Sequence, residues 1–280
     1  MFLAPLFAFS FERETFLVCI KAFIAFCLIS SSIYLINDSI DKNKDKKHPT
    51  KKFRLIASGL VSIKSAIKLS ITLLFFSFLI GFSLNSFFGL LLVLYFLVQI
   101  LYCFKLKHLP IIEFFCVASG FIMRSIAGGV ASGIFISPWF VSSVGMLSLF
   151  LVVEKRKAEI LNLKNSKLIT RNVLKSYSLP LINKYEGVLT SSIVFTYSLW
   201  AYGQSIGGPQ QTPYMIFTIP LVMLGIFRYQ MLSEMKQIKN DKKSKINLLE
   251  TPEKIIFEDK PIQIIVSSWF SIIICMTFFT

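Results

Sequence analysis

The sequence offers few of the residues that soluble enzymes most often use for chemistry. It has two histidines, five cysteines, and 15 acidic residues against 30 Lys and Arg. All the cysteines fall in apolar segments without a metal or redox spacing, which is typical of small packing residues. His48 and His108 lie in basic loops too far apart to predict a metal pair. There is no Ser/His/Asp set, P-loop or zinc spacing, and the apolar first residues do not resemble a cleavable signal peptide.

Apolar residues, in contrast, are abundant and come in long runs. They make up 54% of the chain, which includes 29 Phe, and the mean hydropathy is +0.67. A bilayer-spanning helix needs about 20 apolar residues, and a soluble domain would not carry several uninterrupted runs of that length. The sequence therefore predicts an all-α, polytopic membrane helical bundle that forms one domain over residues 1–280.

Eight full transmembrane helices are predicted, with an apolar stub before them. The stub covers residues 1–10 and is too short to cross a bilayer. The full spans are expected at about 15–36, 60–82, 86–103, 111–130, 136–153, 185–204, 212–230 and 262–280.

The positive charge is concentrated in alternate connections between these spans. Loops 37–59, 104–110, 154–184 and 231–261 hold 7, 2, 8 and 7 Lys or Arg, whereas the connections near 83–86, 131–137 and 205–211 hold none. This alternation follows the positive-inside rule, so the four basic loops are expected to face the cytoplasm from the cell (cytoplasmic) membrane. The net charge of +15 is thereby explained without a nucleic-acid partner, and part of it would attract a polyanionic substrate.

The first of these loops carries the most informative pattern in the chain. Asn37, Asp38, Asp41 and Asp45 follow directly on an apolar span, and on a continuing helix the three aspartates share one face. Carboxylate and amide oxygens suit Mg²⁺, which keeps waters for phosphates to displace. Basic residues follow, so the sequence predicts a magnesium-diphosphate site at the cytoplasmic end of this helix. A solvated loop beside the membrane would explain the lysines but not the phased aspartates.

The second long loop has a related pattern with more cations. Lys155, Arg156 and Glu159 lie within one and a half helical turns, and Lys155 and Glu159 can share a face. Together the two loops would clamp a substrate that carries several phosphates. Taken alone, the second pattern would be interpreted as a surface helix with an ion pair between residues four apart.

Arg124 stands out because it lies within a predicted span. A guanidinium near the bilayer centre costs at least about 2.5 kcal/mol when it faces lipid, so Arg124 is expected to face a polar cavity or an anion. A buried ion pair is the alternative, but Glu113 is eleven residues away, about 16 Å along one helix.

A metal-diphosphate clamp in a membrane indicates a reaction in which diphosphate leaves. Metal and cations stabilise the charge that develops on the leaving group. A lipid tail would lie between helices with its head at the cytoplasmic surface. The residues alone do not indicate which carbon bears the diphosphate.

The segment Asn37-Asp38-x-x-Asp41-x-x-x-Asp45 resembles the NDxxDxxxD first motif of the UbiA superfamily of intramembrane prenyltransferases, and the resemblance covers nearly the whole chain. Its details are similar to the decaprenyl-phosphate phosphoribosyltransferase branch. That branch continues HPTKxxRPIAxG, and the run from His48 to Gly59 matches it except for Leu55 in the proline position. The other matching segments are Tyr102 with Leu106-Lys107-His108, the run Met123 to Ala131, Lys155-Arg156-Lys157-Ala158-Glu159, Phe227-Arg228-Tyr229 and Asp259-Lys260-Pro261.

The resemblance implies transfer of 5-phosphoribose from phosphoribosyl diphosphate to a polyprenyl (decaprenyl-type) phosphate. Most superfamily members carry a second aspartate-rich motif where this chain has KRxxE, and the extra phosphate of a phosphoribosyl donor needs more cations. The implied metal ligands for Mg²⁺ are Asn37, Asp38, Asp41 and Asp45, and the implied catalytic residues are Asp38, Asp41 and Lys155. The implied substrate-binding residues are Lys51, Arg54, Lys107, Arg124, Lys155, Arg156 and Glu159.

Two other functions remain open at this point. One is a prenyltransferase that moves a prenyl group from prenyl diphosphate to an aromatic or other small acceptor. The other is a carrier or channel for an anionic metabolite, which would use Arg124 and the basic loops but gives no reason for the phased aspartates. Met1 to Ser10 resemble only the end of the family's first helix, so a truncated first helix is expected. Homo-oligomer formation is left open.

Overall fold

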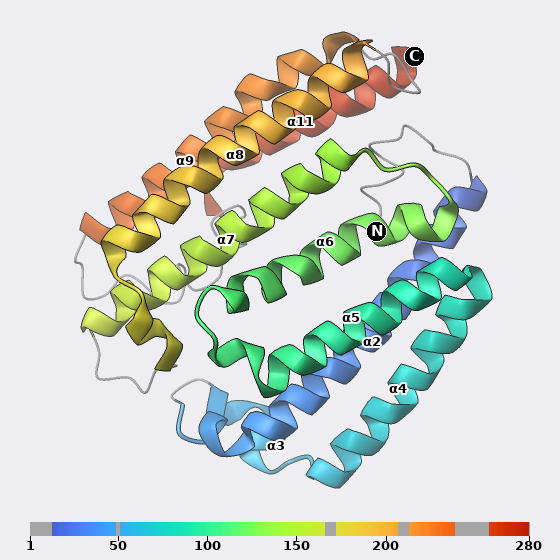
Figure 1. The fold of residues 1–280 in the computed structure, drawn as a ribbon, viewed down its shortest axis with the longest axis vertical. Coiled ribbons are helices and arrows are strands. Elements are labelled where there is room, and N and C mark those ends of the chain that lie inside the picture. The colour runs from blue at the N-terminus through green and yellow to red at the C-terminus, as the bar shows by residue number, and fades with distance from the viewer. Residues whose placement is uncertain (1–12, 49–50, 166–171, 207–212, 239–257, 280) are drawn as a thin grey trace. The chain divides into compact units, whose positions relative to one another are not determined.

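The computed structural model describes residues 13–48, 51–165, 172–206, 213–238 and 258–279 (Figure 1). Within these ranges all regular structure is helical, as predicted. The chain divides into two compact units. The first unit comprises residues 1–136 with 168–173, and the second comprises residues 137–167 with 174–280.

The first unit contains four long helices that pack side by side (Figure 1). They are α2 (Arg13–Asp45), α4 (Ile63–Leu84), α5 (Ser86–Phe104) and α6 (Ile112–Ser132). Short helices connect them: η1 (Lys51–Phe53) and α3 (Leu55–Ser58) after α2, and η2 (Leu106–His108) after α5.

Small and hydroxyl residues let these helices approach closely. Ala22 and Ala25 on α2 are fully buried in the core of this unit. Ser32 on α2 hydrogen-bonds Ser70 on α4 at 2.7 Å between hydroxyl oxygens, and Ser77 donates to the carbonyl of Ala25 at 2.8 Å. Such pairs satisfy polar groups where no water is available, and small residues are favoured at helix contacts in membranes.

The length of α2 matters most for function. Its 33 residues rise about 50 Å, whereas the hydrocarbon core of a bilayer is about 30 Å thick. The apolar part therefore continues without a break into the polar segment that ends at Asp45. The aspartates lie on this rigid extension and not on a loop.

The second unit is also a set of long helices. These are α7 (Pro138–Asn165), α8 (Leu179–Ile206), α9 (Ile219–Ile238) and α11 (Lys260–Phe279), with the short helix η4 (Pro213–Thr218). The short helix η3 (Asn172–Ser176) begins in the first unit and ends in the second. Phe150, Ile193, Ile226 and Ile262 meet in their shared core. Tyr197 fixes the core further, because its hydroxyl contacts that of Thr218 at 2.7 Å and accepts from Trp269 Nε1 at 2.8 Å.

Each predicted span corresponds to a long helix among the described residues. Six of these helices are long and apolar enough to cross a membrane: α2, α4, α5 and α6, the part of α7 over Pro138–Leu161, and the stretch Tyr214–Glu234 that includes most of α9. The chain is therefore an integral membrane protein. α8 is not in that set, and the apolar stretch of α11, Lys260–Met276, is shorter, so these two spans stay predictions. The predicted stub at 1–10 lies outside the described residues.

An ion pair fixes the start of the last helix. Arg228 on α9 donates to both carboxylate oxygens of Asp259, from Nε at 3.2 Å and from Nη2 at 2.9 Å. Asp259 also accepts from the backbone N–H of Ile262 at 3.0 Å, so it caps α11. Two of the late segments that matched the family motif, those around Arg228 and Asp259, thus have a structural role.

We expect Asp259→Ala to destabilise the protein by about 1–2 kcal/mol, because it removes a helix cap together with a two-bond ion pair. Thermal unfolding of the full chain in detergent measures the effect. Glu258→Ala is the matched control, since Glu258 is the exposed acidic neighbour of Asp259. Equal unfolding temperatures for the two variants would contradict this role.

Candidate active site

Three carboxylates gather on the last turns of α2 in the first unit. Asp38, Asp41 and Asp45 all lie on the unbroken helix, as their spacing requires. Asp38 is close enough to Asp41 and Asp45 to interact electrostatically with both, and the side chain of Asn37 interacts with Asp38. The exposed fractions of the three aspartate side chains are 24%, 18% and 7% in chain order, so Asp45 is the most buried.

Arg54 bridges two of these carboxylates. Its Nη1 donates to Asp38 Oδ1 at 2.7 Å and to Asp45 Oδ2 at 3.0 Å. The following helix α3 fixes this position, because Ile56 and Ala57 are buried and α3 packs on α2. Gly59 ends α3 with φ +89°, a left-handed conformation that glycine adopts without strain. The Arg-x-Ile-Ala-x-Gly part of the motif therefore positions Arg54 next to the aspartates.

Lys107 holds the third carboxylate from a different connection. It lies in η2, between α5 and α6, and its Nζ donates to Asp41 Oδ1 at 2.9 Å and Oδ2 at 2.7 Å. The Lys107 side chain is only 8% exposed, whereas Lys44, which lies 3.8 Å from Asp41, is 69% exposed. Lys107 is therefore the main cation for Asp41. The structure thus brings together five predicted site residues from three segments: Asp38, Asp41, Asp45, Arg54 and Lys107.

The donor set fits the metal that the sequence suggested. Carboxylate oxygens on one helix face, with an amide oxygen beside them, are the hard ligands that Mg²⁺ prefers. In the described part of the chain, however, no three Asp, Glu, His or Cys side chains converge on a single point that could hold a metal ion. The aspartates are directed toward Arg54 and Lys107 instead. The three predicted aspartate ligands are therefore close together, but each one is paired with a cation.

Arg124 has polar and aromatic surroundings within the first unit. Its Nη2 donates to the hydroxyls of Ser30 on α2 and Tyr95 on α5, at 3.2 Å for Ser30. Its guanidinium carbon also lies 5.3 Å from the ring centre of Tyr95 and 5.9 Å from that of Phe121. These contacts give the charge polar and aromatic partners inside the unit, and the polar cavity or anion stays a prediction. Glu113 lies on the same continuous helix α6, which rules out the direct ion pair between them.

In the second unit, three consecutive basic residues of α7 have three different environments. Lys155 is exposed, whereas Arg156 and Lys157 are 3% and 2% exposed. Arg156 Nη1 donates to both oxygens of Glu159 at 2.6 Å. The ion pair of this motif is therefore Arg156 with Glu159, three residues apart, and not the Lys155–Glu159 pair that the sequence suggested.

Lys157 is the centre of a buried network that the sequence did not indicate. Its Nζ donates to Glu186 on α8 at 2.7 Å and to Glu234 on α9 at 2.6 Å. Gln230 donates to the second oxygen of Glu186 at 2.9 Å, and Ser233 donates to Glu154 at 2.7 Å. The partners are 29 and 77 residues away from Lys157, so no local spacing could have revealed the network.

Comparison with known proteins assigns the family. Residues 1–250 match the sequence profile of the UbiA prenyltransferase family. This chain belongs to the UbiA prenyltransferase family. Among its relatives is the protein named decaprenyl-phosphate phosphoribosyltransferase from Corynebacterium glutamicum, 35% identical over 78% of this chain and 67% of the relative. The protein of the same name from Mycolicibacterium smegmatis is 33% identical over 92% of this chain and 80% of the relative.

Solved structures agree on the fold. A UbiA homologue from Archaeoglobus fulgidus bound to GPP and Mg²⁺ superposes with a TM-score of 0.70 at 16% identity, covering 99% of this chain and 94% of that one. A structure described as digeranylgeranylglyceryl phosphate synthase has a TM-score of 0.63 at 18% identity, with coverage of 98% and 90%. At these identities the likeness supports the UbiA fold alone.

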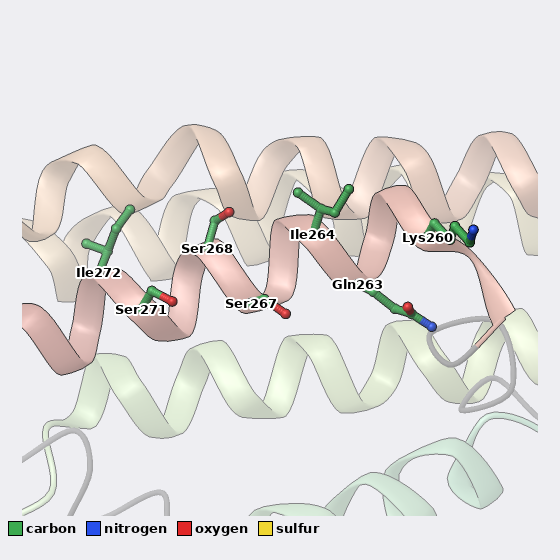
Figure 2. A pocket seen from close by; sticks show the side chains of 7 residues that line it. All are labelled: Lys260, Gln263, Ile264, Ser267, Ser268, Ser271 and Ile272. Atoms are coloured by element: carbon green, nitrogen blue, oxygen red, sulfur yellow. The ribbon is translucent and has the colours of Figure 1, made fainter.

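This UbiA chain also has an open groove along α11 in the second unit. Figure 2 shows Gln263, Ser267 and Ser271 on one side of the helix, four residues apart, while Ile264 points to the other side. Lys260 lies at the start of the groove. None of the predicted metal-binding, catalytic or substrate-binding residues lines it.

We expect Lys157→Met to destabilise the protein by about 3–5 kcal/mol, because Glu186 would remain buried without its cation. Lys155→Met, at the exposed position two residues earlier, should change stability by no more than about 0.5 kcal/mol. Thermal unfolding of both variants in detergent tests the difference. Adding Glu186→Gln to Lys157→Met should restore part of the loss, and no restoration would contradict the pairing.

Proposed function

We propose that this chain transfers 5-phosphoribose from phosphoribosyl diphosphate to a decaprenyl-type polyprenyl phosphate and releases diphosphate. The relatives that carry this activity in their names are 32–35% identical over most of the chain, which supports the proposal. The observation that carries it is the exposed Lys155 beside the Arg156–Glu159 pair, where most family members have a second aspartate-rich motif. Extra cations at this position suit a donor with a phosphate on its sugar as well as a diphosphate.

The carboxylates of α2 would hold Mg²⁺ and, through it, the donor diphosphate. Asn37, Asp38 and Asp41 are the proposed ligands, and bound Mg²⁺ would stabilise charge on the leaving diphosphate. Asp45 is buried and forms an ion pair with Arg54. We therefore assign it mainly to holding Arg54 in place, and direct ligation of Mg²⁺ is its second role. Arg54 and Lys107, whose charges lie beside the carboxylates, would contact the donor phosphates.

The remaining cations would bind the rest of the substrates. Lys51 and Lys155 are assigned to donor phosphates, and Arg124 to a phosphate that reaches the polar contacts around Ser30 and Tyr95. Arg156 orients the Glu159 carboxylate, which would accept hydrogen bonds from ribose hydroxyls. Neither unit alone carries all these groups, so we propose that residues 1–280 act as one catalytic domain.

The chemistry is a single displacement at the anomeric carbon of ribose. An oxygen of the lipid phosphate attacks this carbon while its bond to the diphosphate oxygen breaks, so the configuration inverts. A phosphate monoester is largely ionised near neutral pH, since its second pKa is about 6, and no strong general base is needed. The residues of the chain therefore work by positioning and charge stabilisation.

We further propose that the protein lies in the cytoplasmic membrane with this site facing the cytoplasm. The support is the placement of Lys and Arg in alternate connections, which follows the positive-inside rule. Phosphoribosyl diphosphate is a soluble, highly charged donor, so access from the aqueous side is required. The acceptor lipid would bring its phosphate to the same surface.

The donor is tested directly with membranes that contain this chain, Mg²⁺ and a polyprenyl phosphate. Phosphoribosyl diphosphate with a labelled ribose should produce a labelled lipid, and a chelator should abolish the labelling. Labelled geranyl diphosphate, with an aromatic acceptor, should produce no labelled product. The reverse result would replace the proposal with prenyl transfer, the second candidate, which the fold alone also allows.

Two variants test the residues. Asp41→Asn and Lys155→Ala should each lower transfer by about 100-fold or more, because the first removes a proposed Mg²⁺ ligand charge and the second a cation assigned to the donor phosphates. The controls are Glu258→Gln and Lys184→Ala, which remove exposed charges outside the proposed site. Full activity in both site variants would refute the assignment.

A further inference from the structure

The cations that hold the carboxylates of α2 occupy the oxygens that a metal ion would need. Both oxygens of Asp41 accept hydrogen bonds from Lys107, and Arg54 takes one oxygen each from Asp38 and Asp45. These are the groups assigned to Mg²⁺ and to the donor phosphates. Each cation therefore has two competing sets of partners, the carboxylates and the phosphates.

We propose that Arg54 and Lys107 are exchangeable counter-ions: they neutralise the carboxylates of α2, and they release them to Mg²⁺ when a diphosphate takes the two cations. The proposal rests on the proposed function, which supplies both the metal at the carboxylates and the diphosphate. It makes Arg54 and Lys107 competitors of the metal as well as phosphate ligands.

Charge balance favours an exchange in which metal and diphosphate enter together. Three carboxylates with Arg54 and Lys107 carry one net negative charge, and the exposed Lys44 adds a weaker, screened contribution. Adding Mg²⁺ alone would leave one net positive charge. It would also place the divalent ion close to the side chains of Arg54 and Lys107, which would repel it. A diphosphate removes this repulsion because it accepts from both side chains. Mg²⁺ and diphosphate should thus strengthen each other's binding by the same factor.

The two cations differ in how readily they can move. Arg54 directly follows the short helix η1, and its side chain is 39% exposed. The side chain can therefore move away from the carboxylates into solvent. The Lys107 side chain is 8% exposed and makes two short contacts with Asp41. Because Lys107 is the less solvated cation, its competition with the metal should be the stronger of the two.

The experiment measures metal binding without turnover. Mn²⁺, which also prefers oxygen ligands, is titrated into the purified full chain in detergent, and free Mn²⁺ is followed by electron paramagnetic resonance. Polyprenyl phosphate is omitted. The proteins are wild type, Arg54→Gln and Lys107→Gln, with the matched controls Lys52→Gln and Lys105→Gln. Each control removes one exposed cation from the same connection, so the net charge is equal within each pair.

Without diphosphate, Arg54→Gln and Lys107→Gln should bind Mn²⁺ about fivefold tighter or more than their controls. With inorganic diphosphate, wild type and controls should bind Mn²⁺ at least about fivefold tighter than without it, and both site variants should lose most of this gain. Binding of Mn²⁺ by diphosphate in buffer alone is measured and subtracted. Site variants that bind Mn²⁺ no tighter than their controls would overturn the proposal.

Two further measurements keep the outcome unambiguous. Thermal unfolding identifies a site variant that does not fold. In that case the other site variant tests the proposal, because Arg54 and Lys107 hold different carboxylates. Permanent structural ion pairs predict instead that Arg54→Gln and Lys107→Gln bind Mn²⁺ no tighter than Lys52→Gln and Lys105→Gln when diphosphate is absent. If inorganic diphosphate shows the linkage but phosphoribosyl diphosphate does not bind, the exchange stands and the proposed donor is wrong.

Discussion

The neutralisation of three carboxylates at the end of one membrane helix is the constraint on which the first unit depends. Asp38, Asp41 and Asp45 lie on a rigid extension of α2, so they cannot separate to reduce their repulsion. The connection after α2 supplies Arg54 and the connection after α5 supplies Lys107. These ion pairs fasten both connections to α2, and the same charges are the ones proposed to bind a metal and a diphosphate.

The second unit uses similar chemistry for a different purpose. Successive residues of an α-helix point about 100° apart, so the three basic residues of the KRxxE segment must face three directions. Lys157 faces α8 and α9 and stabilises their packing through Glu186 and Glu234, whereas Lys155 stays exposed. The buried charge of Lys157 thus has a structural role, and Arg156 forms an ion pair with Glu159 on the same helix.

Several polar groups within the apolar helices have partners inside the protein. Ser32 pairs with Ser70, Arg124 contacts Ser30 and Tyr95, and Tyr197 links two other helices of its own unit. A polar group in a membrane must find a partner inside the protein, because lipid offers none. Arg124 shows that neutral hydroxyls and aromatic rings can surround a half-buried cation.

The sequence by itself determined the helical membrane class, the helix positions and the aspartate cluster, because apolar run length and a spacing of three or four residues are local properties. The resemblance to the family also predicted Arg54, Lys107 and Arg156 as substrate-binding cations, and that role stays a prediction. Only the tertiary structure decided which carboxylate each cation holds, that Glu159 pairs with Arg156, and that Lys157 is buried with Glu186. These pairings depend on how helices that are distant in the sequence pack against one another and on how each helix is rotated. The spacing of residues in the sequence does not determine that packing.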